Sequence, residues 1–283
     1  MTEQRKTELS VIANKIRLLA IEGIYNAKSG HPGGSLSCSD LLAYLYNQEM
    51  NVDINTPNEP NRDRLVMSKG HAAPSYYAAL ALKGFFPVEE CKKLRTIGAM
   101  LQGHPDMNKI PGVDMSSGSL GQGISAAGGM AYAGKLDKRN YRVYAILGDG
   151  ELAEGQVWEQ AMFASHYKLD NFTIFIDNNG LQIDGNIADV MNSNPIDEKF
   201  KAFGWYVITI DGHNFDDIEK AINEAKTIKG KPTAIIMKTI KGKNVSYMEN
   251  EAGWHGNAPK EEQFQIAKTE LEKLIKDGEA KLQ

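Results

Sequence analysis

Short apolar runs of β type alternate along this chain with longer segments of helical period. The apolar runs predict strands at residues 64–67, 141–148, 171–177, 205–210 and 233–238. Amphipathic or small-residue-rich segments predict helices at residues 9–27, 40–47, 72–83, 88–95, 121–135, 158–169, 216–228 and 260–276. This alternation favours an α/β fold, and we expect a three-layer α/β/α arrangement with a mainly parallel sheet.

Local signals predict several boundaries. Breakers crowd residues 28–34, which predicts a loop there, and Ser37 or Ser39 is expected to cap the helix that follows. Gly278 is expected to end the last helix. The segment 121–135 is rich in Gly and Ala, which weakens an isolated helix. We therefore expect it to pack closely on a neighbouring element or on a partner chain.

The stretch from Tyr141 to Gly185 contains a βαβ unit with polar residues where both strands end. The first strand ends in Gly148-Asp149-Gly150, and the second ends in Asp177-Asn178-Asn179. Between them, residues spaced i, i+3, i+4, i+7 and i+11 form one face of a helix: Trp158, Ala161, Met162, Ser165 and Leu169. Ligands of open parallel sheets bind at the carboxyl ends of the strands, so we expect a binding site here.

These strand ends carry residue types that bind a diphosphate and a divalent cation. Gly148 and Gly150 let the backbone approach a bulky anion, and the following helix points its N-terminal amides at the same place. Asp149, Asn179 and a carbonyl just after Asn179 are the hard oxygen ligands that Mg²⁺ prefers, together with phosphate oxygens. A tight turn and a capped helix would explain an isolated Gly-Asp-Gly. The second motif, one helix further along the chain, favours a cofactor site.

Of the six histidines, four lie in loops rich in Gly or Pro: His31, His71, His104 and His255. Three interpretations of these four are open: zinc ligands, ordinary surface residues, or a polar cluster around an anionic cofactor and a sugar. No pair has the spacing of zinc ligands, and each lies beside Gly at a predicted functional edge, which favours the third interpretation. We expect His166 and His213 to be packing or turn residues.

Composition and charge exclude other classes of function. The chain has 283 residues, 42% of them hydrophobic, and a formal net charge of −4, so no basic field recruits nucleic acid. No apolar run approaches the ~20 residues of a membrane span, and the N-terminus lacks the apolar core of a signal peptide. Cys38 and Cys91 fit reduced thiols. We therefore expect a cytoplasmic protein with no nucleic acid or membrane partner.

The segment from Gly148 to Asn179 resembles the thiamine diphosphate (ThDP) motif, which begins Gly-Asp-Gly and ends in Asn or Asn-Asn. The surroundings are similar to the transketolases, in consistent order from about Ile16 to Pro259, at GHPGGSLS (30–37), SKGH (68–71), GHP (103–105), SLGQG (119–123) and WHG (254–256). The resemblance implies the fold of a ThDP diphosphate domain. It implies one domain over residues 1–283 with a C-terminal helix from about residue 260, and a chain from which the pyrimidine-binding domain is absent.

The resemblance also implies catalytic roles. His71 and His255 match histidines that touch the diphosphate and the reacting centre. His31 and His104 match histidines that hold the carbonyl and hydroxyl groups of the substrate. Glu154 matches a carboxylate that reaches across the subunit interface toward the glutamate that activates the cofactor.

The same resemblance implies the ligands of the cofactor and the metal. The metal would be Mg²⁺, or another divalent ion such as Ca²⁺ or Mn²⁺, held by Asp149, Asn179 and the carbonyl of Leu181. Apolar contacts around the thiazolium ring would come from Leu120, Ile183 and Ile240. The full set of ThDP contacts would be His71, Gly118, Ser119, Leu120, Gly148, Asp149, Gly150, Glu151, Asn179, Leu181, Ile183, Ile240 and His255.

Two positions depart from the family pattern. Ser119 stands where the family often has Pro, and the loop after Ile240 reads Lys-Gly-Lys-Asn, without the usual second glycine. Both changes bear on the substrate preference more than on the cofactor.

We expect the chain to be the N-terminal subunit of a split transketolase. Full-length transketolases are more than twice this length, and their second domain supplies the glutamate that activates ThDP. The active site would therefore form only with a separate C-terminal subunit, in an α₂β₂ assembly of closed symmetry. The reaction would move a two-carbon ketol unit from a ketose phosphate to an aldose phosphate, as in the pentose phosphate pathway.

Two alternatives remain open. The chain could belong to another ThDP enzyme, as a subunit of a 2-oxo acid dehydrogenase or a relative of deoxyxylulose-phosphate synthase. It could also be a non-catalytic ThDP-binding module. The loops with His31 and His104 favour transketolase, because neither alternative needs histidines that bind substrate hydroxyl groups.

Overall fold

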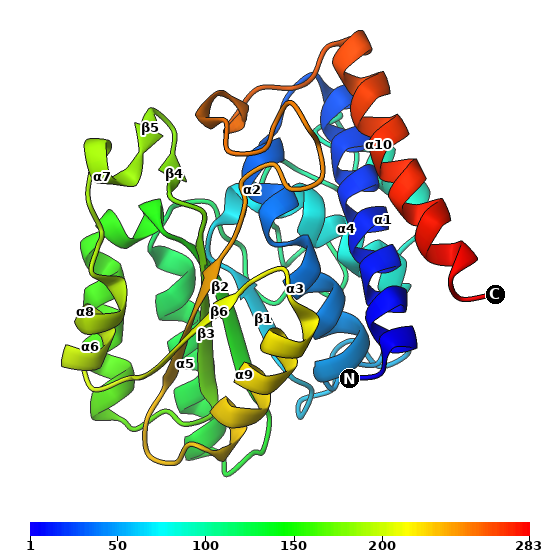
Figure 1. The fold of residues 1–283 in the computed structure, drawn as a ribbon. Coiled ribbons are helices and arrows are strands. Elements are labelled where there is room, and N and C mark those ends of the chain that lie inside the picture. The colour runs from blue at the N-terminus through cyan, green and yellow to red at the C-terminus, as the bar shows by residue number, and fades with distance from the viewer.

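The computed structural model describes all 283 residues, and its centre is a sheet of parallel strands (Figure 1). The strands are adjacent in the order β1, β2, β3, β7, β6. Their bounds are Arg64–Met67 (β1), Val143–Gly148 (β2), Phe172–Asn178 (β3), Tyr206–Asp211 (β6) and Thr233–Lys238 (β7). The predicted parallel sheet is confirmed, and the sequence pattern places all of its strands.

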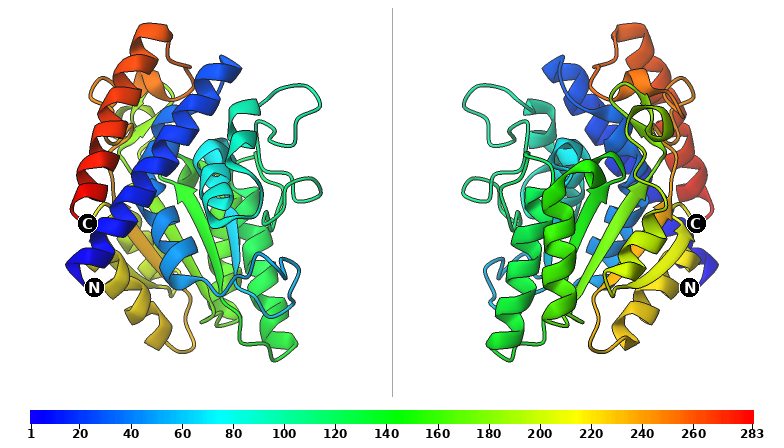
Figure 2. Two further views of the ribbon diagram at one scale, coloured as in Figure 1. Left: turned by 90° about the vertical axis from the view of Figure 1, so that its right-hand side faces the viewer. Right: turned by 90° about the vertical axis from the view of Figure 1, so that its left-hand side faces the viewer.

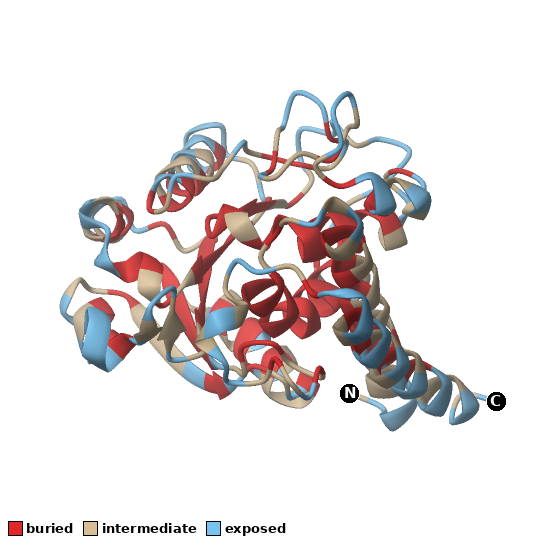
Figure 3. Cartoon of the chain, turned by 90° about the horizontal axis from the view of Figure 1, so that it is seen from above, coloured by how far each residue is buried: buried red, intermediate tan, exposed pale blue.

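Each face of the sheet carries its own apolar core. On β2, Tyr144 and Ile146 belong to one core, whereas Val143, Ala145 and Leu147 belong to the other. Successive side chains of a strand point to opposite faces, so the strand contributes to both cores in alternation. Seen from above, the strands are mostly buried while the outer faces of the helices are exposed (Figure 3).

Helices cover both faces and complete three layers (Figure 2). The face of Tyr144 is covered by α1 (Glu3–Ala27), α3 (Ser39–Tyr44), α4 (Ala73–Lys83) and α9 (Phe215–Thr227). The opposite face is covered by α5 (Gln122–Leu136), α6 (Gly155–His166) and α8 (Ile196–Ala202). Outside this frame, α10 (Glu261–Ala280) packs along α1 (Figure 1). The predicted α/β/α arrangement is confirmed.

Shorter elements connect the layers. A π turn at Leu45–Glu49 continues α3, and 3₁₀ turns lie at Gly70–Ala72, Val88–Lys93, Gly150–Ala153 and Ala252–Trp254. The helix predicted at 88–95 is thus a 3₁₀ turn. A small antiparallel hairpin, β4 (Leu181–Gln182) and β5 (Gly185–Asn186), precedes α7 (Ile187–Val190). None of the helices combines the length and the apolar character that crossing a bilayer requires.

The loop predicted over residues 28–34 is wrong in its second half, because α2 spans Pro32–Ser37. Proline is favoured in the first turn of a helix, where its missing N–H would have no partner anyway. The predicted cap is also wrong: Cys38 precedes α3, and no side chain caps that helix. The segment that carries His31 is therefore anchored to a buried helix.

Two glycines serve close approach between helices. Gly278 does not end the last helix as predicted, because α10 continues to Ala280. A Cβ on Gly278 would lie 2.5 Å from Cγ2 of Val11, so the glycine lets α10 approach α1. In α5, a Cβ on Gly128 would lie 1.7 Å from the amide nitrogen of Gln160 on α6. The close packing predicted for the Gly/Ala-rich segment is confirmed against α6.

Candidate functional site

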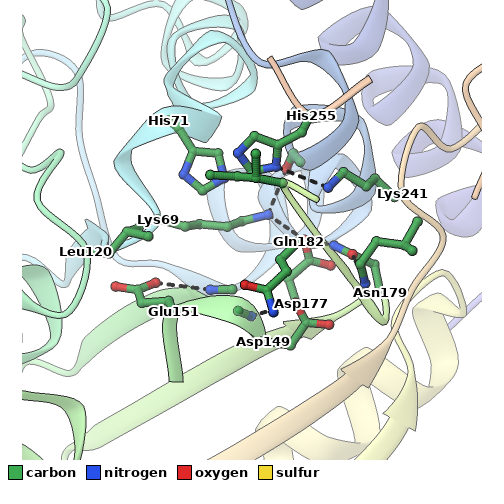
Figure 4. A pocket seen from close by; sticks show the side chains of 15 residues that line it. Lys69, His71, Leu120, Asp149, Glu151, Asp177, Asn179, Gln182, Lys241 and His255 are labelled. Atoms are coloured by element: carbon green, nitrogen blue, oxygen red, sulfur yellow. Dashed lines mark hydrogen bonds and ion pairs between the residues drawn. The ribbon is translucent and has the colours of Figure 1, made fainter. Parts of the chain in front are cut away.

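The ends of β1, β2, β3 and β7 lead into one pocket at the carboxyl edge of the sheet (Figure 4). The predicted site residues that line it are His71, Leu120, Gly148, Asp149, Gly150, Glu151, Asn179, Leu181, Ile183 and His255. The lining residues that were not predicted are Gly34, Lys69, Asp177, Gln182 and Lys241. The parallel topology thus gathers residues from distant parts of the chain at the edge where ligands of such sheets bind.

Asp149 is a buried carboxylate at the end of β2 without a cationic side-chain partner. It is 2% exposed, and it accepts hydrogen bonds from the backbone N–H groups of Gly150 at 2.8 Å and Gly180 at 2.6 Å. Burial, and after it the nearby Asp177 carboxylate, raise the pKa of Asp149 to about 7. Two amide hydrogen bonds only partly compensate a buried negative charge. A divalent cation would supply the missing charge.

Asn179 is held close to this carboxylate by a sharp turn after β3. Gly180 has a φ of +77°, and its N–H reaches Asp149. The Oδ1 atom of Asn179 accepts the N–H of Leu181 at 3.1 Å, while its Nδ2 atom lies 3.4 Å from Asp177. Carboxylate, amide and carbonyl oxygens are the ligand types that Mg²⁺ prefers. The residues present therefore fit the expected metal.

Lys69 and Asp177 form an ion pair beneath the pocket (Figure 4). Asp177 accepts from Lys69 Nζ at 2.5 Å, from Ser37 Oγ at 2.5 Å and from Thr239 Oγ1, so it ties four segments together. Lys69 Nζ also donates to the carbonyl of Gly34 at 2.7 Å. Burial alone would lower the pKa of Lys69, but the Asp177 carboxylate reverses this and raises it. This pair holds the floor of the pocket as a neutral unit.

Glu151 lines the pocket, yet its oxygens are already occupied by the protein. Oε1 accepts from Ser68 Oγ at 2.5 Å and from Gly121 N–H at 2.9 Å, and Oε2 accepts from Gly148 N–H at 3.1 Å. Its carboxylate therefore joins the end of β2 to the loop after β1 and to the start of α5. Glu151 therefore stabilises the wall of the pocket.

Three of the predicted histidines form a cluster: His31, His71 and His255. Their ring centroids are 5.1 to 5.5 Å apart. Burial, reinforced by nearby cationic groups, lowers the pKa of His31 and of His255 to about 4 and holds the pKa of His71 well below its usual value. All three are neutral near pH 7. The Nδ1 atom of His31 is buried without a hydrogen-bond partner in the protein, so it is available to a ligand.

Lys241 brings a positive charge into the same pocket. Its Nζ lies 3.1 Å from Nδ1 of His255 (Figure 4). Burial lowers the pKa of Lys241 to about 8, and its side chain has no salt bridge. Sequence reasoning missed Lys69 and Lys241, because lysines are mostly solvated. The available signal was their position directly after predicted strands.

The remaining predicted residues do not line the pocket: His31, His104, Gly118, Ser119, Glu154 and Ile240. His104 is exposed and packs against the backbone of Gly118, where a Cβ would lie 3.0 Å from its ring. Arg95 lies between the loop that carries His31 and the loop that carries His104, and it donates a hydrogen bond to Ser29 at 2.9 Å. Burial lowers the pKa of His104, and the positive charge of Arg95 lowers it further. Glu154 is exposed at the start of α6. His166 is exposed on α6, away from the cluster.

Residues 9–274 match the family model described as transketolase, thiamine diphosphate binding domain. The chain is 48% identical over 273 residues to the 6-deoxy-6-sulfo-D-fructose transketolase subunit SqwG of Clostridium sp. (strain MSTE9), a match that covers 96% of this chain and 99% of the relative. It is 41% identical over 277 residues to one of the subunits of the apulose-4-phosphate transketolase of Phocaeicola vulgatus, covering 96% of this chain and 98% of the relative.

Longer proteins match over part of their length. Human transketolase is 44% identical over 256 residues, which cover 90% of this chain and 40% of that protein. The crystal structure of transketolase from Campylobacter jejuni superimposes with a TM-score of 0.86 at 32% identity, covering all of this chain and 48% of the other. The chain therefore spans less than half of these longer proteins and nearly all of the two subunits.

Proposed function

This chain belongs to the transketolase family, as an N-terminal ThDP-binding subunit. From this membership we propose the metal and the residues that hold the cofactor, the partner chain and the class of substrate. The observation that carries the proposal is the pocket itself, where the buried carboxylate of Asp149 shares one space with neutral His71 and His255 and with the ammonium group of Lys241. A divalent cation would pair with the carboxylate of Asp149, and a diphosphate bound to that cation would pair with the ammonium group of Lys241.

The divalent cation, Mg²⁺ or an ion such as Ca²⁺ or Mn²⁺, would be held by Asp149, Asn179 and the carbonyl of Leu181. Support comes from the burial of Asp149 without a cationic partner and from the turn that keeps Asn179 beside it. Two diphosphate oxygens would nearly complete an octahedral set of ligands.

The diphosphate would be held by the N–H of Gly150, the rings of His71 and His255 and the ammonium group of Lys241, which line the pocket together. The apolar side chains of Leu120, Ile183 and Ile240 would contact the thiazolium ring, and Gly118 and Ser119 would contact the aminopyrimidine. ThDP, when bound, supplies the nucleophilic carbon that takes up the two-carbon unit.

The histidines act on the sugar. A neutral imidazole can accept a proton at one nitrogen and donate from the other, which suits the hydroxyl and carbonyl groups of a ketose. His31 and His104 hold these groups, and the unpartnered Nδ1 of His31 supports this assignment. The ring of His255 lies 5.5 Å from that of His31 and 5.1 Å from that of His71, centroid to centroid, so the three imidazoles can face one substrate.

The site is completed by a separate partner chain, as the names of the two subunit relatives imply. The partner carries the pyrimidine-binding domain and the glutamate that activates the cofactor. Glu154, exposed at the start of α6, reaches toward that glutamate across the interface. Closed symmetry favours an α₂β₂ assembly with two sites.

The reaction is the transfer of a two-carbon ketol unit from a ketose with an anionic end group to an aldose phosphate. One relative is named for a sulfo-fructose and another for a sugar phosphate, so the end group is a phosphate or a sulfonate. The alternative is decarboxylation of a 2-oxo acid by the same cofactor.

The test combines binding and turnover in the complex with the partner. Calorimetry should detect ThDP binding with Mg²⁺ and lose it with a chelator. Ketol transfer should then be assayed with xylulose 5-phosphate, fructose 6-phosphate, apulose 4-phosphate and 6-deoxy-6-sulfofructose as donors. Transfer from at least one donor supports the proposal. Release of CO₂ from a 2-oxo acid, with no transfer from any ketose, would select the alternative.

A further inference from the structure

A chain of hydrogen bonds runs from α1 to the loop after β7, outside the pocket. Arg17 Nη1 lies 3.2 Å from Asn14 Oδ1 and 3.2 Å from Asp40 Oδ1, and its Nη2 donates to Asp40 Oδ2. Asp40 Oδ2 lies 2.7 Å from Nδ1 of His213. The other ring nitrogen of His213, Nε2, accepts the backbone N–H of Ile240 at 2.9 Å. The buried α1 and α3 side chains are thereby connected to a backbone atom next to the pocket.

The neighbours of His213 fix its protonation. A backbone N–H can only donate, so Nε2 presents its lone pair to Ile240, and Nδ1 carries the proton that is donated to Asp40. Burial acts against ionisation of Asp40, but Arg17 and His213 outweigh it and hold the pKa of Asp40 at about 2. The two ring nitrogens of His213 therefore have different, assigned partners.

The segment that follows β7 is tied to the site on both sides of Ile240. Before it, Thr239 Oγ1 donates to Asp177. After it, the N–H of Gly242 donates to the carbonyl of Gly33 at 3.0 Å. The contact with His213 fixes the amide between these two ties, and so sets the direction in which the chain leaves Ile240.

Lys241 leaves the backbone at that point and enters the pocket. The residue is 1% exposed, and its Nζ reaches His255. The side chain packs against Gly33, and the direction in which the chain leaves Ile240 sets where its four rotatable bonds begin. The backbone at Ile240 thus sets the direction in which the Lys241 side chain enters the pocket.

We propose that His213 is a positioning residue of the cofactor site: by accepting the N–H of Ile240, it fixes the loop from which Lys241 enters the pocket. The inference rests on the proposed function, in which Lys241 holds diphosphate oxygens. The sequence predicts only a packing or turn residue at position 213. A packing residue needs the volume of the ring, whereas a positioning residue needs an acceptor at the place of Nε2.

Two substitutions separate these requirements in the complex with the partner. In His213→Gln the side-chain oxygen falls near the place of Nε2 and can still accept from Ile240. In His213→Asn the amide nitrogen falls near the place of Nδ1, so the residue keeps its donor to Asp40 and loses the acceptor. His166→Asn, an exposed histidine on α6, is the matched control.

The readout is the dissociation constant of ThDP from calorimetry of the complex with Mg²⁺, compared with the ThDP concentration that gives half-maximal activity. We expect it to rise about tenfold in His213→Asn and by no more than about twofold in His213→Gln, since the loss of one buried hydrogen bond weakens binding by about this factor. The kcat at saturating ThDP should stay within about threefold of the wild type in both. The control should behave as the wild type.

Equal half-saturation in His213→Asn, His213→Gln and the wild type would overturn the inference. So would an equal loss in both variants with an equal fall in melting temperature, since that outcome describes a structural residue. If the wild-type complex binds no ThDP, the proposed function has failed and this inference fails with it. If the wild-type complex binds ThDP and the variants give either of the first two results, the positioning role of His213 is rejected and the proposed function stands.

Discussion

Nζ of Lys69 donates a hydrogen bond to Oδ2 of Asp177 at a distance of 2.5 Å, beneath the pocket. The Lys69 side chain is 2% exposed and the Asp177 side chain is fully buried. Removing one partner of a buried ion pair costs about 3–5 kcal/mol, because the other charge stays buried without compensation. We expect Lys69→Met to lower the free energy of unfolding by about this amount in urea titrations. The double variant Lys69→Met/Asp177→Asn should regain part of the loss, because both charges are then gone.

The control for this prediction is an exposed ion pair on α8. Lys201 and Asp197 are 2.8 Å apart, with side chains that are 56% and 41% exposed. Lys201→Ala should change the free energy of unfolding by less than about 1 kcal/mol. If Lys69→Met is as stable as Lys201→Ala, the buried pair does not hold the floor of the pocket.

Binding of the metal and ThDP should depend on the ionisation of Asp149. Its pKa of about 7 means that the carboxyl group is largely protonated below pH 7 in the metal-free protein. A metal ligand must be deprotonated, so binding releases this proton, and affinity should fall up to about tenfold per pH unit below pH 7. Calorimetry of the complex at pH 6, 7 and 8, in two buffers with different heats of ionisation, measures both the affinity and the proton release.

Asp149→Asn should abolish binding that depends on Mg²⁺, since it removes the charged metal ligand. Asp184→Asn, an exposed carboxylate on the nearby hairpin turn, is the matched control and should bind as the wild type. Unchanged ThDP affinity in Asp149→Asn would show that Asp149 is not a metal ligand.

His104→Ala should separate the substrate from the cofactor. His104 is exposed beside Gly118 and does not line the pocket. We expect kcat/KM for ketol transfer to fall about 10- to 100-fold, because a hydrogen bond to the reacting sugar is lost. The ThDP concentration for half-saturation should change by less than about twofold. An equal loss of cofactor affinity would mean that His104 acts on ThDP and not on the sugar.

The histidine cluster should destabilise the protein in acid. The pKa values of His31 and His255 are about 4, below their unfolded value near 6.5. Between these values the unfolded chain binds more protons than the folded chain, so the free energy of unfolding rises with pH and is lost as the pH falls from about 6.5 toward 4. His255→Asn should show a smaller loss between pH 6.5 and 4.5 than the wild type in urea titrations. An unchanged slope in His255→Asn would show that the ring is protonated in the folded state.

Much of the fold follows from local patterns in the sequence. The run Arg64–Met67 was predicted with its exact bounds, because a short apolar segment between polar residues has few other structures open to it. Helix α2 was missed, since Gly33 and Gly34 disfavour a helix when taken alone. In the structure both glycines are buried against the site, where a Cβ on Gly33 would lie 2.9 Å from Lys241. Tertiary packing outweighs the local preference there.

The site was predictable where backbone chemistry and residue type coincide. Asp149 and Asn179 follow strands and carry the oxygen atoms that a metal needs, so a sequence pattern can identify them. Lys69 and Lys241 were missed because the property that matters is burial of the side chain in the pocket, which depends on three-dimensional contacts. The tautomer of His213 was beyond sequence reasoning for the same reason, since Asp40 and Ile240 are distant in the chain.

The central claim is that this chain provides the diphosphate side of a transketolase site that a partner chain completes. The most direct measurement is ketol transfer with Mg²⁺ and saturating ThDP by this chain alone, by the partner alone and by the two mixed, using the panel of ketose donors and an aldose phosphate acceptor. We predict transfer only in the mixture, with a rate that saturates at an equimolar ratio of the chains. Transfer by this chain alone would contradict the shared site, and a mixture that binds ThDP but transfers no ketol unit would contradict the reaction.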